Sequence, residues 1–173
     1  NNSVPGKGNF KSDVIFVGEA PGKNEDMKGE PFIGIAGKKL SMALENAGIT
    51  RDDVYITNIV KCRPPKNRVP TTDERNTCQN YLEKEIGIIK PKIICVLGNT
   101  VFKSLLDGKE IIKFRGKIVR KNNQLYFLTI HPAATIYNQK LINVLKRDMK
   151  KLFRLIKELK NGKEIKIDIE HTS

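Results

Sequence analysis

Residues 14–22 read Val14-Ile15-Phe16-Val17-Gly18-Glu19-Ala20-Pro21-Gly22, and the rest of the chain is organised around them. The first four residues are apolar and predict a short buried strand, which runs directly into a turn with two glycines and a proline. Glycines at such a turn let backbone N–H groups approach a ligand that bulkier residues would exclude. On its own, this stretch fits a tight turn without chemistry equally well.

Strand-like and helix-like segments alternate along the chain after this turn. Apolar runs predict further strands, at 54–60, 92–98, 117–120 and 125–131. Helical spacing and capping residues predict helices, at 37–47, 71–89, 99–106 and 139–160, with Asn99 and Asn138 as caps. The alternation indicates an α/β fold with three layers, in which helices cover both faces of a mostly parallel sheet.

Ligands of such sheets bind outside the carboxyl ends of the strands. The fold therefore gathers Glu19, Asn58 and His131 around one crevice. The amide of Asn58 offers one acceptor and two donors, which suits a base edge with both carbonyl and N–H groups. The alternatives are structural, with Asn58 tying down a loop and His131 as an ordinary strand-end residue.

Phe32 stands in Pro31-Phe32-Ile33-Gly34, where the proline and glycine favour an exposed loop position. An aromatic ring there can stack on a flat ligand, and such stacking contributes about 1–3 kcal/mol per base. The alternative for Phe32 is a place in the core.

The length of 173 residues fits one domain, 1–173, with a polar arm at 1–12 and a tail at 161–173. Residues 164–170 of the tail alternate strictly and predict an edge strand or pairing with a partner. The net charge of +13 indicates a polyanionic partner, most often nucleic acid, with solubility as an alternative explanation for part of it. No apolar run has the length of a membrane span and no signal-peptide pattern opens the chain, so we expect a cytoplasmic protein.

Three cysteines are too few for a disulfide framework, and Cys95 in the middle of an apolar strand is expected in the core. Cys62 and Cys78 are weak evidence for a metal site, because a tetrahedral site needs four ligands. A proline-rich loop beside Asn58 concentrates basic residues. They form a plausible rim for DNA phosphates, with a solvated loop as the alternative, and are Lys61, Arg63, Lys66 and Arg68.

Four motifs in order resemble family 4 of the uracil-DNA glycosylase superfamily over roughly residues 5–153. They are Gly18-Glu19-Ala20-Pro21-Gly22 with Glu25-Asp26, Pro31-Phe32-Ile33-Gly34 with Ala36-Gly37, Thr57-Asn58-Ile59-Val60-Lys61-Cys62-Arg63-Pro64-Pro65 with Asn67-Arg68, and His131-Pro132-Ala133-Ala134. The resemblance implies a central four-stranded parallel sheet and a monofunctional, prokaryotic DNA repair enzyme, acting as a monomer. Its reaction is hydrolysis of the N-glycosidic bond of uracil in single- or double-stranded DNA.

The resemblance also assigns roles to residues. Asn58 recognises the uracil edge, Phe32 stacks on the base, and His131 stabilises charge on the departing ring. Glu19 is a candidate for orienting water, although Ala20 stands where the classical enzymes have an aspartate. The implied uracil pocket comprises Gly18, Glu19, Ala20, Gly22, Phe32, Asn58 and His131. Pro132 and Ala133 join the DNA-contacting set, and the segment 133–137 can supply a wedge, with Ile136 or Tyr137 as candidates.

Family members carry a 4Fe–4S cluster on four cysteines, of which Cys62 and Cys78 match two. The other two are absent from this sequence, which starts at Asn1 rather than Met. Either they precede the residues given, which we expect, or this member has lost the cluster. Two other functions are considered: a catalytically weak binder of uracil or damaged DNA on the same fold, and an unrelated nucleotide-binding enzyme. The second lacks both a P-loop and a G-x-G-x-x-G motif.

Overall fold

The computed structural model describes residues 4–61 and 71–172, without the side chains of residues 74–80. Its centre is a parallel four-stranded sheet in the order β3-β2-β4-β6. These strands are β2 (Val14–Gly18), β3 (Tyr55–Asn58), β4 (Ile93–Leu97) and β6 (Gln124–Thr129). Gly18 pairs in register with Asn58, so the first turn and the polar end of β3 meet at the same edge. The α/β class and the parallel centre predicted from the sequence are confirmed.

Three short strands extend this sheet to seven, in the order β1-β3-β2-β4-β6-β5-β7. They are β1 (Lys7–Gly8), β5 (Ile118–Lys121) and β7 (Ile169–Glu170). The sheet is therefore larger than the four strands expected, because β5 pairs antiparallel with β6 and the N-terminal arm and the C-terminal tail each add an edge strand. In the tail only two residues of the alternating stretch pair with β5.

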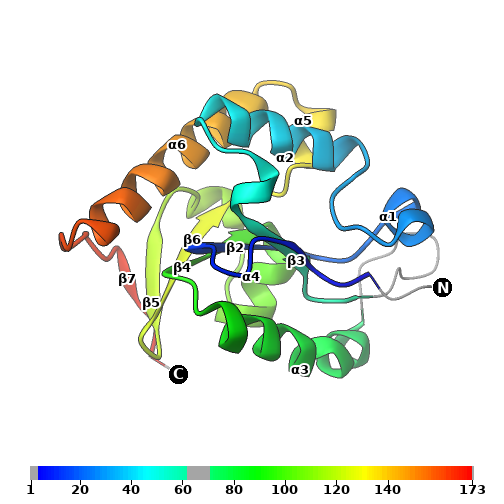
Figure 1. Cartoon of the computed structure of the whole chain (residues 1–173), viewed down its shortest axis with the longest axis horizontal. Coiled ribbons are helices and arrows are strands. Elements are labelled where there is room, and N and C mark those ends of the chain that lie inside the picture. The colour runs from blue at the N-terminus through cyan, green and yellow to red at the C-terminus, as the bar shows by residue number, and fades with distance from the viewer. Residues whose placement is uncertain (1–3, 62–70, 173) are drawn as a thin grey trace.

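Helices cover both faces of the sheet (Figure 1). The α-helices are α1 (Lys23–Lys28), α2 (Ile35–Asn46), α3 (Thr72–Ile89), α4 (Asn99–Leu106), α5 (Ala134–Tyr137) and α6 (Leu141–Lys160). Short 3-10 turns are η1 (Arg51–Asp53) and η3 (Ile111–Lys113). Among the described residues, none of the helices is both long and apolar enough to cross a membrane.

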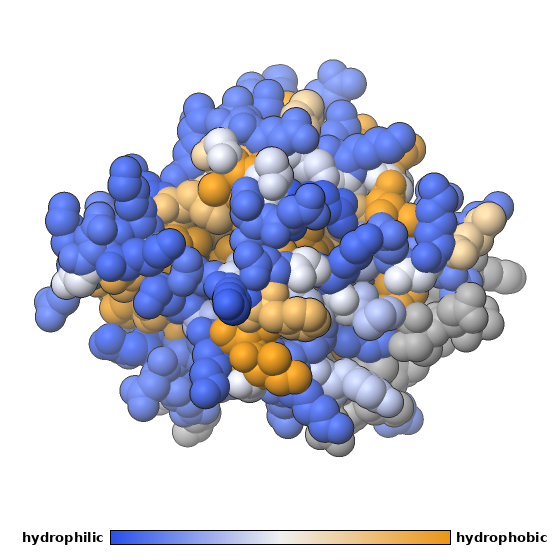
Figure 2. Space-filling model, viewed as in Figure 1, coloured by the Kyte–Doolittle hydropathy of each residue, from blue (hydrophilic) through white to orange (hydrophobic). Residues whose placement is uncertain are grey.

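Strand β2 divides the core because successive side chains point to opposite faces. Val14 and Phe16 pack with α2 and α6, whereas Ile15 and Val17 pack with α3 and α4. The surface turned to the viewer in Figure 2 is mostly hydrophilic, as the abundance of charged residues predicts.

Two predicted helix caps are wrong. Gly98, not Asn99, is the N-cap of α4, and Asn99 instead accepts the Ile111 N–H at 2.7 Å. Lys140 precedes the first residue of α6, and the Asn138 side chain accepts the Lys140 N–H at 3.2 Å in the turn before it. Asn138 thus stabilises the adjoining turn, whereas Asn99 binds the first residue of η3, and both are uses of the amide that compete with helix capping.

Candidate active site

A cavity of about 610 Å³ lies at the carboxyl edge of the sheet, where the turns after β2, β3 and β6 converge. Its wall includes Glu19, Asn58 and His131, which the structure thus brings together from three segments far apart in sequence. The remaining predicted pocket residues in the wall are Ala20, Gly22 and Phe32. Among exposed residues, Lys23 and Tyr137 stand at the rim.

Asn58 ends β3 with its side chain 2 % exposed. Within the described structure its Oδ1 atom is buried and accepts no hydrogen bond. An unpaired buried carbonyl oxygen costs free energy, so its retention calls for an explanation such as a missing ligand. Gly18 lies against this amide, because a Cβ there would come within 2.6 Å of Oδ1.

Phe32 follows α1 in a loop, as expected, but its ring is buried rather than exposed. The ring stacks on the imidazole of His131 with centroids 5.6 Å apart and planes 30° apart. Its backbone has φ of +51°, a left-handed conformation that is uncommon for a residue with a bulky side chain. The surroundings must therefore hold this conformation in place.

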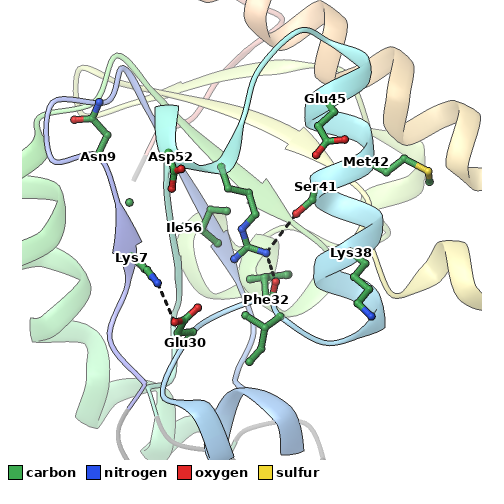
Figure 3. Close-up of a pocket in the computed structure, with 13 residues that line it drawn as sticks. Lys7, Asn9, Glu30, Phe32, Lys38, Ser41, Met42, Glu45, Asp52 and Ile56 are labelled. Carbon is green, nitrogen blue, oxygen red and sulfur yellow. Dashed lines mark hydrogen bonds and ion pairs between the residues drawn. The ribbon is translucent and has the colours of Figure 1, made fainter.

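Arg51 and Glu25 hold the Phe32 loop from two sides. The guanidinium of Arg51 donates to the carbonyls of Phe32 and Pro31, the latter at 2.6 Å. In Figure 3 dashed lines join Phe32 and Ser41 to this guanidinium, beside a second hollow of about 740 Å³. Neither Arg51 nor Glu25 was assigned a role from the sequence. Glu25 occupies the capping-box position of α1, and this signal could have identified it.

Glu25 binds two loops with one carboxylate. Its Oε1 accepts the Gly22 N–H at 2.9 Å, and its Oε2 accepts the N–H groups of Ile33 and Gly34 at 2.9 and 2.6 Å. The turn after β2 and the loop that carries Phe32 are thereby fixed to each other. Three N–H donors on one carboxylate are a strong, charge-assisted arrangement.

His131 has a defined tautomer. The Ala133 N–H donates to its Nδ1 at 3.0 Å, so in the neutral ring the proton is on Nε2. Burial lowers the pKa of His131 to about 4, which keeps the imidazole neutral at physiological pH. Gly98 lies against the Cβ atom of His131, because a Cβ at Gly98 would come within 2.9 Å of it, and the φ of +95° also favours glycine there.

Glu19 follows β2 directly and its carboxylate is held from α4. The Thr100 hydroxyl donates to Oε2 at 2.9 Å. Beyond His131, Pro132 is buried in the turn, whereas a DNA-contacting position was predicted for it. Ala133 lines the cavity, while Ile136 and Tyr137 are 37 % and 90 % exposed beside it.

Lys61 lies in the interior, not at the exposed rim where a DNA contact was predicted for it. Its side chain is buried, and its ammonium group binds Thr57, the Asn58 carbonyl and Glu85. The other rim residues, Arg63, Lys66 and Arg68, lie outside the described residues, as does Cys62. Cys78 belongs to α3, but its side chain is likewise not described. Cys95 is buried in β4, as expected, and burial raises the pKa of its thiol.

Comparison with known proteins matches residues 5–157 to the family described as the uracil DNA glycosylase superfamily. A type-4 uracil-DNA glycosylase of Saccharolobus solfataricus is 45% identical over 177 residues, covering 96% of this chain and 80% of the relative. A type-4 uracil-DNA glycosylase of Sulfurisphaera tokodaii is 46% identical, and the match covers 89% of this chain and 74% of that relative. A type-4 uracil-DNA glycosylase of Thermotoga maritima is 41% identical, and the match covers 91% of this chain and 84% of that relative.

Proposed function

This chain belongs to the uracil DNA glycosylase superfamily, and we propose from that premise how its residues remove uracil from DNA. Its activity is that of a uracil-DNA glycosylase in DNA repair, a hydrolase of N-glycosyl bonds. The observation that carries the mechanism is the convergence of Asn58, Phe32 and His131 on one cavity. Because the glycosidic carbon is inaccessible in a stacked duplex, the uracil nucleotide must flip into that cavity.

Asn58 reads the base in this proposal. Uracil presents an N–H at position 3 and a carbonyl at position 4, which match the acceptor and donors of a side-chain amide. The buried Oδ1 of Asn58, unpaired within the described structure, supports this role because uracil N3–H would satisfy it. Phe32 supplies the aromatic surface against which the flat ring packs.

His131 stabilises the leaving group. Negative charge grows on uracil O2 as the glycosidic bond breaks, and the Nε2–H of the neutral imidazole is the donor for it. The backbone N–H groups of Glu19 and Ala20 assist, since Pro21 has no N–H and the Gly22 N–H already donates to Glu25. Glu19 then orients the water that adds to the oxocarbenium-like sugar, its own carboxylate being steadied by Thr100.

A 4Fe–4S cluster is proposed on the family resemblance alone. The described residues include no group of three or more His, Cys, Asp or Glu side chains that could hold a metal ion. Cys62 and the side chain of Cys78 lie outside the described part, and we route no catalytic step through the cluster. Iron and acid-labile sulfide in the purified protein, lost in Cys62→Ser and Cys78→Ser, would support it; their absence would refute it.

Contact with the DNA backbone is proposed for the start of α6 instead of Lys61. A hollow of about 600 Å³ there is lined by four basic residues and two asparagines, and it adjoins α5 at the cavity rim. The residues are Asn46, Lys140, Asn143, Lys146, Arg147 and Lys150. Since each lost phosphate contact lowers the slope of log K against log salt by about one, Lys146→Ala/Arg147→Ala should lower it by about two.

The matched control is Arg154→Ala/Lys157→Ala, on the exposed face of the same helix but farther from the cavity. Equal slopes in the two double variants would refute a specific contact at the start of α6. Temperature and DNA length are held constant, so that only the salt concentration changes the affinity within each series.

The activity itself is tested with labelled oligonucleotides that carry one uracil opposite guanine, opposite adenine, or unpaired. Incubation, hot alkali and a denaturing gel should reveal scission at uracil and none in a thymine control. The protein acts as a binder rather than an enzyme if it shows tight, salt-sensitive binding to uracil-DNA without scission. The unpaired substrate also establishes the preference for single or double strands.

A further inference from the structure

A buried polar network lies beneath Asn58, on the side of β3 away from the cavity. Tyr55 and Thr57 alternate with Ile56 and Asn58 along the strand, so they face α3. Glu85 of α3 accepts the Tyr55 hydroxyl at 2.6 Å and the Thr57 hydroxyl at 3.1 Å. One carboxylate therefore binds two residues of the strand that ends in Asn58.

Lys61 completes this network. Its ammonium group donates to Glu85, to the Thr57 hydroxyl, and to the backbone carbonyl of Asn58 at 2.6 Å. An ammonium group has three N–H donors, so these acceptors use all of them. The side chains of Lys61 and Glu85 are only 5 % and 15 % exposed, which leaves the cation no access to a phosphate.

The N-terminal arm covers the network. The Val4 N–H donates to the Lys61 carbonyl at 2.6 Å, and Val4 is itself 1 % exposed. A Cβ at Gly6 would lie 2.3 Å from Glu85 Oε2 and 2.4 Å from the Tyr55 hydroxyl, so glycine is required for this close approach. The arm thus keeps water from the ion pair, which strengthens its electrostatic interaction.

The end of β3 is also fixed from β2. The Ile59 N–H donates to the Gly18 carbonyl at 2.9 Å, and the Val60 N–H donates to the Glu19 carbonyl at 3.1 Å. Lys61 follows these two bonds and folds back onto the carbonyl of Asn58. The backbone of Asn58 is therefore held between the neighbouring turn and the Lys61–Glu85 pair.

We propose that Lys61 and Glu85 are positioning residues that set the amide of Asn58 for base recognition and touch neither DNA nor uracil. This rests on the proposed function of Asn58. A shift of about 1 Å at a reacting group can cost about 100-fold in rate, so loosening this carbonyl should reduce excision. The effect reaches the substrate through Asn58 alone.

The test compares Lys61→Met, Glu85→Gln and the double variant Lys61→Met/Glu85→Met. Single-turnover excision should fall by about 10- to 100-fold in Lys61→Met and in the double variant, and less in Glu85→Gln, whose amide keeps one acceptor oxygen. Salt slopes of DNA binding should match the wild type in all three. If Lys61 instead bound a DNA phosphate, the slope of log K against log salt should be lower by about one in Lys61→Met, and Glu85→Gln should bind DNA more tightly.

The double variant separates positioning from stability. Lys61→Met leaves a buried carboxylate without its counter-ion. Two methionines remove both charges and should recover the part of the melting temperature that the unpaired charge costs, although the Tyr55 and Thr57 hydroxyls lose their acceptor. Excision that stays low while the melting temperature recovers supports positioning; excision that recovers with it overturns the proposal. Lys113→Met/Glu110→Gln, an exposed ion pair, is the control and should excise as the wild type does.

Preference in binding affinity for uracil-DNA over thymine-DNA is measured in parallel. If the wild type excises and the variants excise equally well, this inference alone fails. If the wild type does not excise, the proposed function fails, and the uracil preference decides the inference: it should fall about tenfold in the double variant, and an unchanged preference would refute positioning.

Discussion

His131 depends on its surroundings for its chemical form. The Ala133 N–H fixes the tautomer, and burial lowers the pKa to about 4. A histidine with an ordinary pKa near 6.5 would be partly charged in weakly acidic solution, and its cation could no longer accept the Ala133 N–H. The strand-end position was visible in the sequence, but the tautomer depends on a backbone turn two residues on.

This lowered pKa predicts a pH dependence of stability. Between about pH 6.5 and pH 4 the unfolded chain binds a proton at His131 that the folded chain does not, so stability falls as pH falls. Above about pH 6.5 both states are neutral and the contribution is constant. Relative to His131→Asn, the wild type should lose up to about 2 kcal/mol of unfolding free energy between pH 7 and pH 5. Urea denaturation at both values measures it, and parallel losses in the two proteins would contradict it.

Gly18 is required by its neighbours in the cavity. A Cβ there would lie 2.2 Å from the Phe32 ring and 2.6 Å from Asn58 Oδ1, closer than atoms can approach. Gly18→Ala should therefore displace both groups and reduce excision by about 100-fold. Gly87→Ala is the control, since its Cβ meets open space in α3 and alanine favours a helix. Comparable excision by the two variants would show that the close packing is unimportant.

Arg51 should affect the chemistry without touching the base. Lysine keeps its charge but cannot hold two carbonyls with a planar fork, so Arg51→Lys should free the Phe32 loop. We expect about tenfold weaker inhibition by free uracil and slower excision. Lys38→Ala, an exposed residue of the same hollow, should behave like the wild type. Unchanged inhibition in Arg51→Lys would exclude this role.

Strand β6 and helix α6 are joined by a buried carboxylate. Asp148 is 1 % exposed and accepts the Thr129 hydroxyl at 2.7 Å and the Arg115 Nε–H at 3.0 Å. Thr129 lies two residues before His131 in the chain. Asp148→Asn removes the charge that pairs with Arg115 and should cost about 3 kcal/mol of stability. Chemical denaturation measures the loss. Glu170→Gln, in an exposed pair with Arg120, should change stability little, and an equal loss there would contradict the argument.

The elements were predictable where one pattern dominated. Continuous apolar runs marked the parallel strands correctly, because strands covered on both faces have little else in them. The caps of α4 and α6 were not predictable, because Asn138 bonds instead to the turn before α6 and Asn99 bonds to Ile111, twelve residues farther along the chain. Short edge strands such as β1 depend on contacts with β3 that no local pattern records.

Across the whole molecule, the site was predicted more reliably by position than by exposure. Parallel topology brought Glu19, Asn58 and His131 to one cavity, as the order of the strands required. Lys61 was misjudged because a lysine in a basic loop has the same sequence signature whether it faces solvent or Glu85. Whether such a lysine is exposed or buried depends on partners distant in sequence, such as Glu85 for Lys61, which are identified only in the folded chain.

Two side chains, those of Asn58 and His131, act on one base in the proposed reaction. The most direct test is single-turnover excision of uracil from a labelled oligonucleotide by the wild type, Asn58→Ala and His131→Ala, each first shown to be folded by thermal melting. We predict excision by the wild type and a loss of about 10²- to 10³-fold in each variant. Wild-type rates in both folded variants would contradict the assignment of this cavity as the active site.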